Sequence, residues 1–327
     1  MNSIAAPVLT VPALAQAVMR GERRAIAQAI NLIERNAGDS AELLDALRSR
    51  VGRAYRVGVT GPPGAGKSTL MARLAAALRL RGQSVAVIAV DPTSPFSGGA
   101  LLGDRVRMSE IWGDDRVFIR SMAARDALGG LAAKTIDVAD ILDAAGFDVI
   151  LLETVGVGQG EIDVAQAADT TVVVLTPESG DEVQAAKAGL MEIAEVFVLN
   201  KCDRPGSDAA FAAIRAMLNL RSRDLPRGEW LAALVRAAAG QGSGVDETLA
   251  AIDAHRDYQR ENLRLRRRRI DRARRQVLDL VAERVRCHVA LCLSTPEFSR
   301  RVEQIVDGTG SPYALANELS KEWSNES

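Results

Sequence analysis

A glycine-rich stretch early in the chain has the residue types and spacing that hold a triphosphate. Residues 61–69 read G-P-P-G-A-G-K-S-T and follow an apolar stretch at 57–60. Glycines let main-chain N–H groups approach phosphate oxygens, and a helix starting near Gly66 points its positive end at the same anion. We expect the Lys67 amine to reach the β- and γ-phosphates and the Ser68 hydroxyl to bind Mg²⁺. The expected phosphate-loop residues of this Walker A motif are Gly61, Pro62, Pro63, Gly64, Ala65, Gly66, Lys67, Ser68 and Thr69, the last at the α-phosphate.

A second motif, further along the chain, indicates which base is bound. Residues 200–203 read N-K-C-D and follow the apolar stretch 196–199. Guanine presents its N1–H and 2-amino group as adjacent donors, so the Asp203 carboxylate can accept both, whereas adenine has no such pair. The Lys201 stem can lie along the purine ring, and Asn200 can link this loop to the phosphate loop. In this order after a Walker A loop, the motif predicts GTP rather than ATP as the ligand.

Acidic residues after other apolar stretches are the candidates for binding Mg²⁺ and orienting the attacking water. Asp91 and Glu153 each end such a stretch, and Asp104 lies in the glycine-rich sequence S-G-G-A-L-L-G-D-R. Gln159 is a candidate for sensing the γ-phosphate. Three alternatives stay open: Asp91 could cap a turn, the glycine-rich segment could be a plain loop, and Gln159 could be an ordinary polar residue. No arginine can be assigned to the transferring phosphoryl group, so we expect slow hydrolysis that a partner stimulates.

Composition is that of a soluble globular protein. Of 327 residues, 47% are hydrophobic and 25% are charged, enough to fill a core. Aromatics at 4% and a net charge of −1 argue against a stacking platform for nucleic acid and against a polyanion partner. Three cysteines without paired spacing predict a reducing cytoplasm, and only two histidines accompany them, so no zinc site is indicated. No apolar run is long enough to span a membrane.

Apolar stretches alternate with helical patterns through the middle of the chain. Such alternation predicts an α/β fold with a doubly wound, mostly parallel sheet that binds ligands at the carboxyl ends of its strands. The expected strands are 56–60, 85–90, 116–120, 148–153, 170–175 and 196–200, and the clearest helices are 67–81, 130–145 and 181–194. The predicted domains are an N-terminal helical extension (1–54), a P-loop domain (55–255) and a C-terminal helical arm (256–327).

The C-terminal arm is expected to contain one long helix over 256–293, followed by helices over 296–307 and 312–323. The long helix carries an arginine-rich run at 264–275, which three interpretations fit. It could be a solvated face paired with nearby acids, a nucleic-acid contact, or a docking site for an acidic partner. The apolar stripe on the same helix predicts dimerisation, because such a stripe needs a surface against which to be buried.

Together, these blocks resemble the methylmalonyl-CoA mutase-associated GTPases, the MeaB/MMAA-type family that is also called ArgK-like. The resemblance covers about residues 10–320 and is most specific in G-G-A-L-L-G-D-R and E-T-V-G-V-G-Q. The matching blocks are 61–69, 91–94, 98–108, 153–159, 180–184, 200–203 and 311–314. The resemblance implies a SIMIBI-class P-loop metallochaperone that binds GTP, GDP and Mg²⁺. Members gate the loading of adenosylcobalamin onto an acyl-CoA mutase and help to eject inactivated cofactor.

The resemblance also implies partners and further site residues. The partners are the mutase, the adenosyltransferase and a second copy of the chain, joined through the C-terminal arm. Asp181, Gln184 and Lys187 resemble the third switch of the family, although their spacing alone also fits a solvated helix start. The guanine-contacting stretch corresponds to Ala238, Ala239 and Gly240, with Ala238 in place of the serine of the family. No D-x-H-x-x-G motif is present, so we do not expect this chain alone to bind cobalamin.

The sequence does not identify the client mutase. Methylmalonyl-CoA mutase is the default, and isobutyryl-, ethylmalonyl- or 2-hydroxyisobutyryl-CoA mutase would leave the same pattern in the GTPase. Two other functional classes remain: a GTPase that acts on RNA or the ribosome through its basic arm, and a kinase of a transport protein. Scarce aromatics oppose the first class, and no dedicated phosphotransfer base supports the second.

Overall fold

The structure, a computed structural model, describes residues 9–35, 38–92, 113–124, 130–154, 160–178, 190–261, 263–293 and 295–326. The chain forms two compact units, residues 1–269 and 270–327. Each unit is described by itself below.

A parallel sheet forms the centre of the first unit. Its seven strands are β1 (Tyr55–Thr60), β2 (Val85–Pro92), β3 (Val117–Ala124), β4 (Val149–Thr154), β5 (Thr170–Leu175), β6 (Val196–Leu199) and β7 (Ala233–Arg236). Their order is β3-β2-β4-β1-β5-β6-β7, and every neighbouring pair runs parallel. The predicted α/β class, the doubly wound sheet and all six predicted strands are confirmed. The edge strand β7 was not predicted.

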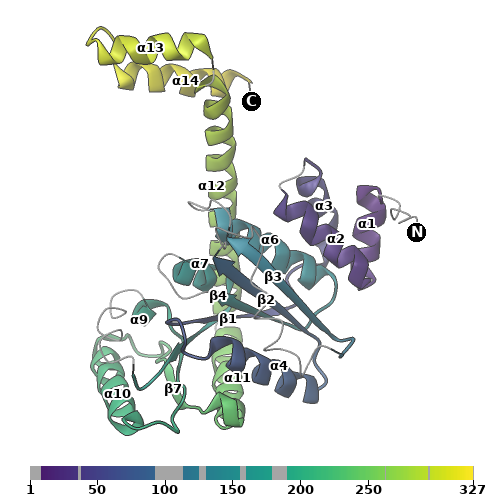
Figure 1. Cartoon of the computed structure of the whole chain (residues 1–327), viewed down its shortest axis with the longest axis vertical. Coiled ribbons are helices and arrows are strands. Elements are labelled where there is room, and N and C mark those ends of the chain that lie inside the picture. The colour runs from purple at the N-terminus through teal and green to yellow at the C-terminus, as the bar shows by residue number, and fades with distance from the viewer. Residues whose placement is uncertain are drawn as a thin grey trace. The chain divides into compact units, whose positions relative to one another are not determined.

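Helices cover both faces of this sheet (Figure 1). On one face, α6 (Gly130–Ala144) and α7 (Gly160–Ala167) pack against side chains such as Ile88 and Ile150. On the other, α4 (Lys67–Leu80) and α11 (Val245–Glu261) pack against side chains such as Val57 and Val87. Because neighbouring strand residues point to opposite faces, these valine- and isoleucine-rich strands are buried on both sides. The short α9 (Leu190–Ile193) and the longer α10 (Ser207–Asp224) complete the layer beside β5 and β6.

The N-terminal helices are part of the same core. They are α1 (Val11–Met19), α2 (Arg23–Glu34) and α3 (Ser40–Leu47), followed by a 3₁₀ turn at Arg48–Arg50. Fully buried Ile26, Ile30 and Leu43 share one apolar cluster with Ile141 of α6. The predicted N-terminal helices are therefore confirmed, and they cover α6 on the side away from the sheet.

The expected single helix over 256–293 is wrong. Helix α11 ends at Glu261, and α12 (Arg264–Leu293) begins after a break in which Leu263 has φ +55°. A left-handed residue cannot continue a right-handed helix, so the chain changes direction there. In the second unit, α13 (Pro296–Val306) and α14 (Pro312–Glu326) follow as predicted, with Thr295 accepting the Phe298 N–H at 3.2 Å as a helix cap.

The first arginines of α12 bind the amino-terminal edge of the sheet, opposite the phosphate loop. Arg269 donates to the main-chain oxygen of Ala54 at 2.9 Å and to the buried Asp169 carboxylate at 2.9 Å. Arg268 donates to Glu195 at 2.5 Å. We call Arg268 and Arg269 the arginine clasp. Among the three interpretations of the arginine run, the solvated face paired with acids fits only its later part, where Arg274 lies 3.3 Å from Asp271.

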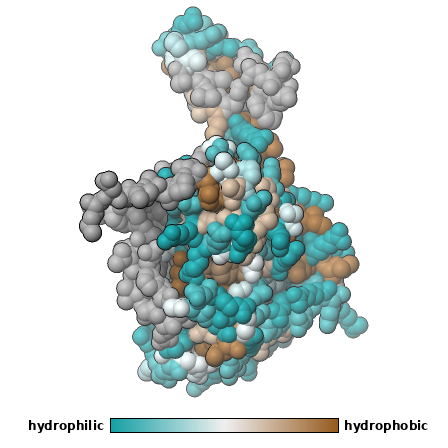
Figure 2. Space-filling model, turned by 90° about the vertical axis from the view of Figure 1, so that its right-hand side faces the viewer, coloured by the Kyte–Doolittle hydropathy of each residue, from teal (hydrophilic) through white to brown (hydrophobic). Residues whose placement is uncertain are grey.

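Surface polarity accompanies this core. Figure 2 shows hydrophilic residues over most of the described surface on one side, with hydrophobic residues in small groups. Among the described helices, none is both long enough and apolar enough to span a membrane.

A buried histidine lies beside the arginine clasp. His255 is 3% exposed, its Nδ1 lies 2.8 Å from the Thr170 hydroxyl, and the Trp230 ring packs against it with centroids 4.9 Å apart. Burial lowers the pKa of His255 to about 3, and the nearby Arg268 charge lowers it further than Asp169 raises it. The imidazole is therefore neutral in the folded protein at physiological pH.

This burial predicts acid sensitivity. Between pH 6.5 and about 3 the unfolded chain binds a proton at His255 that the folded chain does not, so stability falls as the pH falls. One such proton contributes up to about 1.4 kcal/mol per pH unit to the slope. Urea unfolding from pH 7.5 to 4.5 should give a steeper loss for the wild type than for His255→Gln. Equal slopes in the two proteins would contradict the prediction, whatever their absolute stabilities.

Candidate nucleotide-binding site

The phosphate loop leaves β1 at the carboxyl edge of the sheet through glycines whose positions admit no side chain. Gly61 has φ +136°, and a Cβ there would lie 2.1 Å from the main-chain oxygen of Val174. Gly66 has φ +90°, and its Cβ would lie 2.4 Å from the side-chain nitrogen of Asn200. Both the left-handed backbone and the close approach therefore require glycine. Gly66 directly precedes α4, so the predicted strand, loop and helix are all present.

The Lys67 amine lies inside the loop. Its Nζ donates to the main-chain oxygens of Gly61 at 2.8 Å and Pro62 at 3.0 Å, and the residue is 7% exposed. A cation held there, at the amino end of α4, faces the same place as the unbonded N–H groups of the first helical turn. Together they form a cradle for an anion.

Two of the predicted magnesium ligands meet at the carboxyl ends of neighbouring strands. The Ser68 hydroxyl donates to Glu153 Oε1 at 2.7 Å, and β4 brings Glu153 alongside Val59 of β1. A serine hydroxyl and a carboxylate are the oxygen ligands that Mg²⁺ prefers beside phosphate oxygens, so this donor set fits the ion. Because the hydroxyl gives its proton to Glu153, its oxygen lone pairs remain available.

Other predicted residues cannot be placed beside this pair. Asp91 lies at the end of β2, but its side chain is outside the described part of the structure. The remaining predicted catalytic and switch residues outside the described ranges are Asp104, Gln159, Asp181, Gln184 and Lys187.

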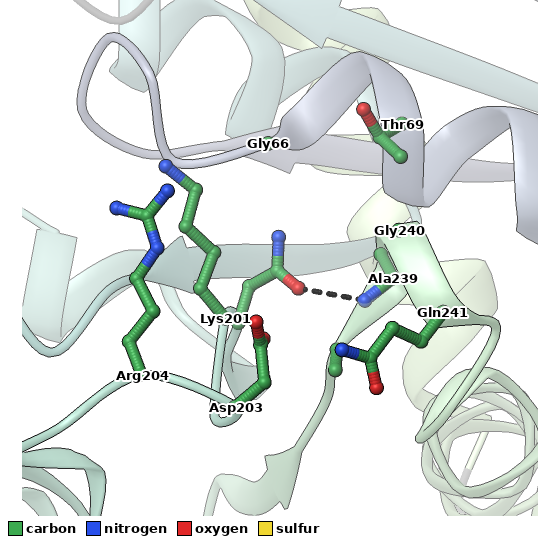
Figure 3. Close-up of a pocket in the computed structure, with 10 residues that line it drawn as sticks. Gly66, Thr69, Lys201, Asp203, Arg204, Ala239, Gly240 and Gln241 are labelled. Atoms are coloured by element: carbon green, nitrogen blue, oxygen red, sulfur yellow. Dashed lines mark hydrogen bonds between the residues drawn. The ribbon is translucent and has the colours of Figure 1, made fainter.

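Asn200 joins the phosphate loop to the base loop (Figure 3). Its Nδ2 donates to the main-chain oxygen of Ala65 at 2.8 Å, and its Oδ1 accepts the N–H of Ala239 at 3.0 Å. The side chain is buried, so breaking either contact would leave a polar group unsatisfied away from water. The predicted link between the two motifs is confirmed, and one amide also fixes a third loop.

The base loop is a tight turn that directs its charged side chains into one cavity. Lys201 has φ +58°, and the Arg204 N–H donates to the Lys201 main-chain oxygen at 3.0 Å. Lys201, Asp203 and Arg204 all line the cavity, whereas the Cys202 thiol donates to the Leu199 oxygen at 3.0 Å. Burial raises the pKa of that thiol. The turn thus separates the cavity-lining residues from a structural cysteine.

The third wall of the cavity follows β7. Ala238 and Ser243 pair as an antiparallel bridge around a 3₁₀ turn at Ala239–Gln241, with the Ala238 N–H 3.0 Å from the Ser243 oxygen. Gly244 has φ +80°, and a Cβ there would lie 2.1 Å from the Arg236 oxygen. Main-chain contacts therefore close the loop with alanine at position 238.

These three segments enclose a cavity of about 180 Å³. Its lining residues are Gly66, Thr69, Asn200, Lys201, Asp203, Arg204, Ala238, Ala239, Gly240 and Gln241. In Figure 3 the Asp203 carboxylate stands between Lys201 and Gln241, below the start of α4. An acceptor for a purine edge and a cradle for phosphates therefore share one cavity. The sequence argument missed Arg204 and Gln241, for which position next to a motif was the only signal.

Comparisons with known proteins agree with this geometry. The family model described as methylmalonyl Co-A mutase-associated GTPase MeaB matches residues 26–292. A putative GTPase of Pyrococcus abyssi is 42% identical over 309 residues, which are 94% of this chain and 95% of the relative. The GTPase ArgK of Escherichia coli is 40% identical over 249 residues, 73% of this chain and 75% of the relative. A crystal structure described as an LAO/AO transport system kinase has a TM-score of 0.71 and 27% identity, covering 97% of this chain and 100% of that one.

Proposed function

Because the chain belongs to the family of methylmalonyl Co-A mutase-associated GTPases, we propose that it is a GTP-hydrolysing chaperone of an adenosylcobalamin-dependent acyl-CoA mutase. It gates cofactor loading and protects or reactivates the mutase, which is methylmalonyl-CoA mutase or a close relative such as 2-hydroxyisobutyryl-CoA mutase. The observation that carries the proposal is the family match over residues 26–292, whose description names association with the mutase.

The described residues support hydrolysis of GTP to GDP and phosphate. Lys67 is placed to neutralise charge on the β- and γ-phosphates, which otherwise opposes transfer of the phosphoryl group. Ser68 and Glu153 would hold Mg²⁺, which supplies further charge neutralisation when it is bound. Asp203 would fix the guanine edge at the other end of the cavity. The site thereby aligns the triphosphate for attack by water.

The rest of the proposal concerns parts for which the family resemblance is the support. Asp91, Asp104 and Gln159 complete the magnesium and water site. The segment with Asp181, Gln184 and Lys187 relays the nucleotide state to the mutase. The chain acts in the cytoplasm as a homodimer joined through residues 256–327, works with the adenosyltransferase, and does not hold cobalamin by itself.

The test is GTP hydrolysis by the purified protein with and without each candidate mutase. We expect the rate to rise several-fold with the cognate mutase and not with an unrelated protein of similar charge. A pull-down from the native host, repeated with GDP and a non-hydrolysable GTP analogue, should recover the same mutase. Failure of all four mutases to stimulate hydrolysis would contradict the proposal. Stimulation by RNA that collapses with salt would favour the RNA class instead, and phosphate transfer to a transport protein would favour the kinase.

A further inference from the structure

Arg204 is a cation in the nucleotide cavity that the known motifs do not include. It is the residue directly after Asp203, and it lines the same cavity as Gly66 and Lys201. The left-handed conformation of Lys201 folds the turn back, so Arg204 and Lys201 rise from the same side of the base loop (Figure 3). The base loop therefore presents two cations to the cavity.

An acidic residue after β5 holds this guanidinium. Arg204 Nη1 lies 2.6 Å from Glu178 Oε1, and the Arg204 hydrogen bond lowers the pKa of Glu178. Both side chains are about half exposed. An exposed ion pair contributes little to stability, so this contact serves to orient Arg204 rather than to hold the fold together.

The location of Arg204 selects the part of the nucleotide that it meets. Neighbouring Cα atoms are about 3.8 Å apart, so Arg204 starts beside the residue that marks the base. The phosphates have their own donors in Lys67 and the N–H groups of α4, which belong to a different loop. We propose that Arg204 binds the nucleoside of the guanine nucleotide, either by stacking its planar guanidinium on the purine or by donating to the ribose hydroxyls, with Glu178 as its positioning residue.

This inference rests on the GTPase family membership and not on the identity of the mutase. It differs from the role of Asp203, because Arg204 has no acceptor with which to read the guanine donors. It differs from the role of Lys67, because a nucleoside contact does not depend on the number of phosphates. A planar group is also required, so lysine should replace Arg204 poorly.

The experiment compares nucleotide affinities of the full-length wild type, Arg204→Ala and Arg204→Lys by calorimetry with Mg²⁺. We expect Arg204→Ala to weaken GMP, GDP and a non-hydrolysable GTP analogue by the same factor, about 3- to 10-fold, and Arg204→Lys to recover less than half of the loss. A ribose contact would make the loss disappear with 2′,3′-dideoxyguanosine diphosphate, and a stacking contact would keep it.

Two further variants give the controls. Arg223→Ala removes the same charge from an exposed position on α10 outside the cavity and should leave all affinities unchanged. Glu178→Ala should change GDP affinity only while Arg204 is present, and not in the Arg204→Ala background. Wild-type affinity in Arg204→Ala would overturn the proposal. So would a loss that grows from GMP to the triphosphate analogue, because it would place Arg204 on the phosphates. Since each arm measures binding without a mutase, failure here leaves the proposed chaperone function to its own test.

Discussion

Replacing Asp203 with Asn should remove the preference of the protein for guanine nucleotides while leaving its fold intact. The carboxylate lines the cavity, where it can accept both the N1–H and the 2-amino donors of guanine. An asparagine has one acceptor, and its own NH₂ group faces the second donor, so one hydrogen bond is lost and a repulsive contact replaces it. We expect GDP affinity to fall about 10²- to 10³-fold. Xanthosine diphosphate, which has a carbonyl in place of the 2-amino group, should bind the variant better than it binds the wild type.

Competition among guanosine, xanthosine and adenosine diphosphates measures this change. The matched control is Cys202→Ser, one residue away, because the Cys202 thiol points to the Leu199 oxygen rather than into the cavity. That variant should keep the wild-type order of affinities. If Asp203→Asn also retained its preference for guanine, the base would have to be recognised elsewhere.

Removing the Lys67 amine should have the largest effect on hydrolysis. Without it, the cavity lacks the cation that the phosphate loop holds between two carbonyl oxygens. Charge on the transferring phosphoryl group would then be poorly neutralised, and we expect single-turnover GTP hydrolysis by Lys67→Ala to fall at least about 10²- to 10³-fold, with weaker GTP binding.

Two measurements separate this effect from general damage. Lys134→Ala removes a lysine that bonds the Glu34 oxygen far from the cavity in sequence and fold, and it should hydrolyse GTP normally. Thermal unfolding of Lys67→Ala should show an intact fold, because the two carbonyl oxygens that it leaves lie at the loop surface near water. Near-normal turnover in Lys67→Ala would contradict the assignment of the phosphate loop.

The sequence predicted the central strands well because they are continuous valine- and isoleucine-rich runs. The edge strand β7 lacked that signal, since A-L-V-R is short and only half buried. The break between α11 and α12 was also missed. Neither proline nor glycine stands there, and only the left-handed Leu263 interrupts the helix. Hydrophobic periodicity continues across such a break, so a pattern argument cannot find it.

The candidate site was predicted where a motif fixes both residue type and geometry. Spacing alone brought Ser68 to Glu153 and Asn200 to the phosphate loop. Arg204 was missed because its direction depends on one left-handed residue, Lys201, which is unusual for lysine and invisible in the sequence. The arginine clasp was missed for a related reason: its partners lie on segments brought together only by the sheet.

The arginine clasp has a practical consequence for anyone who wishes to study the catalytic half alone. A shortened protein that stopped at residue 255 would retain every nucleotide motif, yet it would lack the guanidinium groups that reach Glu195 and Asp169. Asp169 has no exposed surface, and its carboxylate would lose an ionic partner. Recombinant fragments should therefore extend through Arg269, so that poor yield from a shorter fragment is not mistaken for loss of nucleotide affinity.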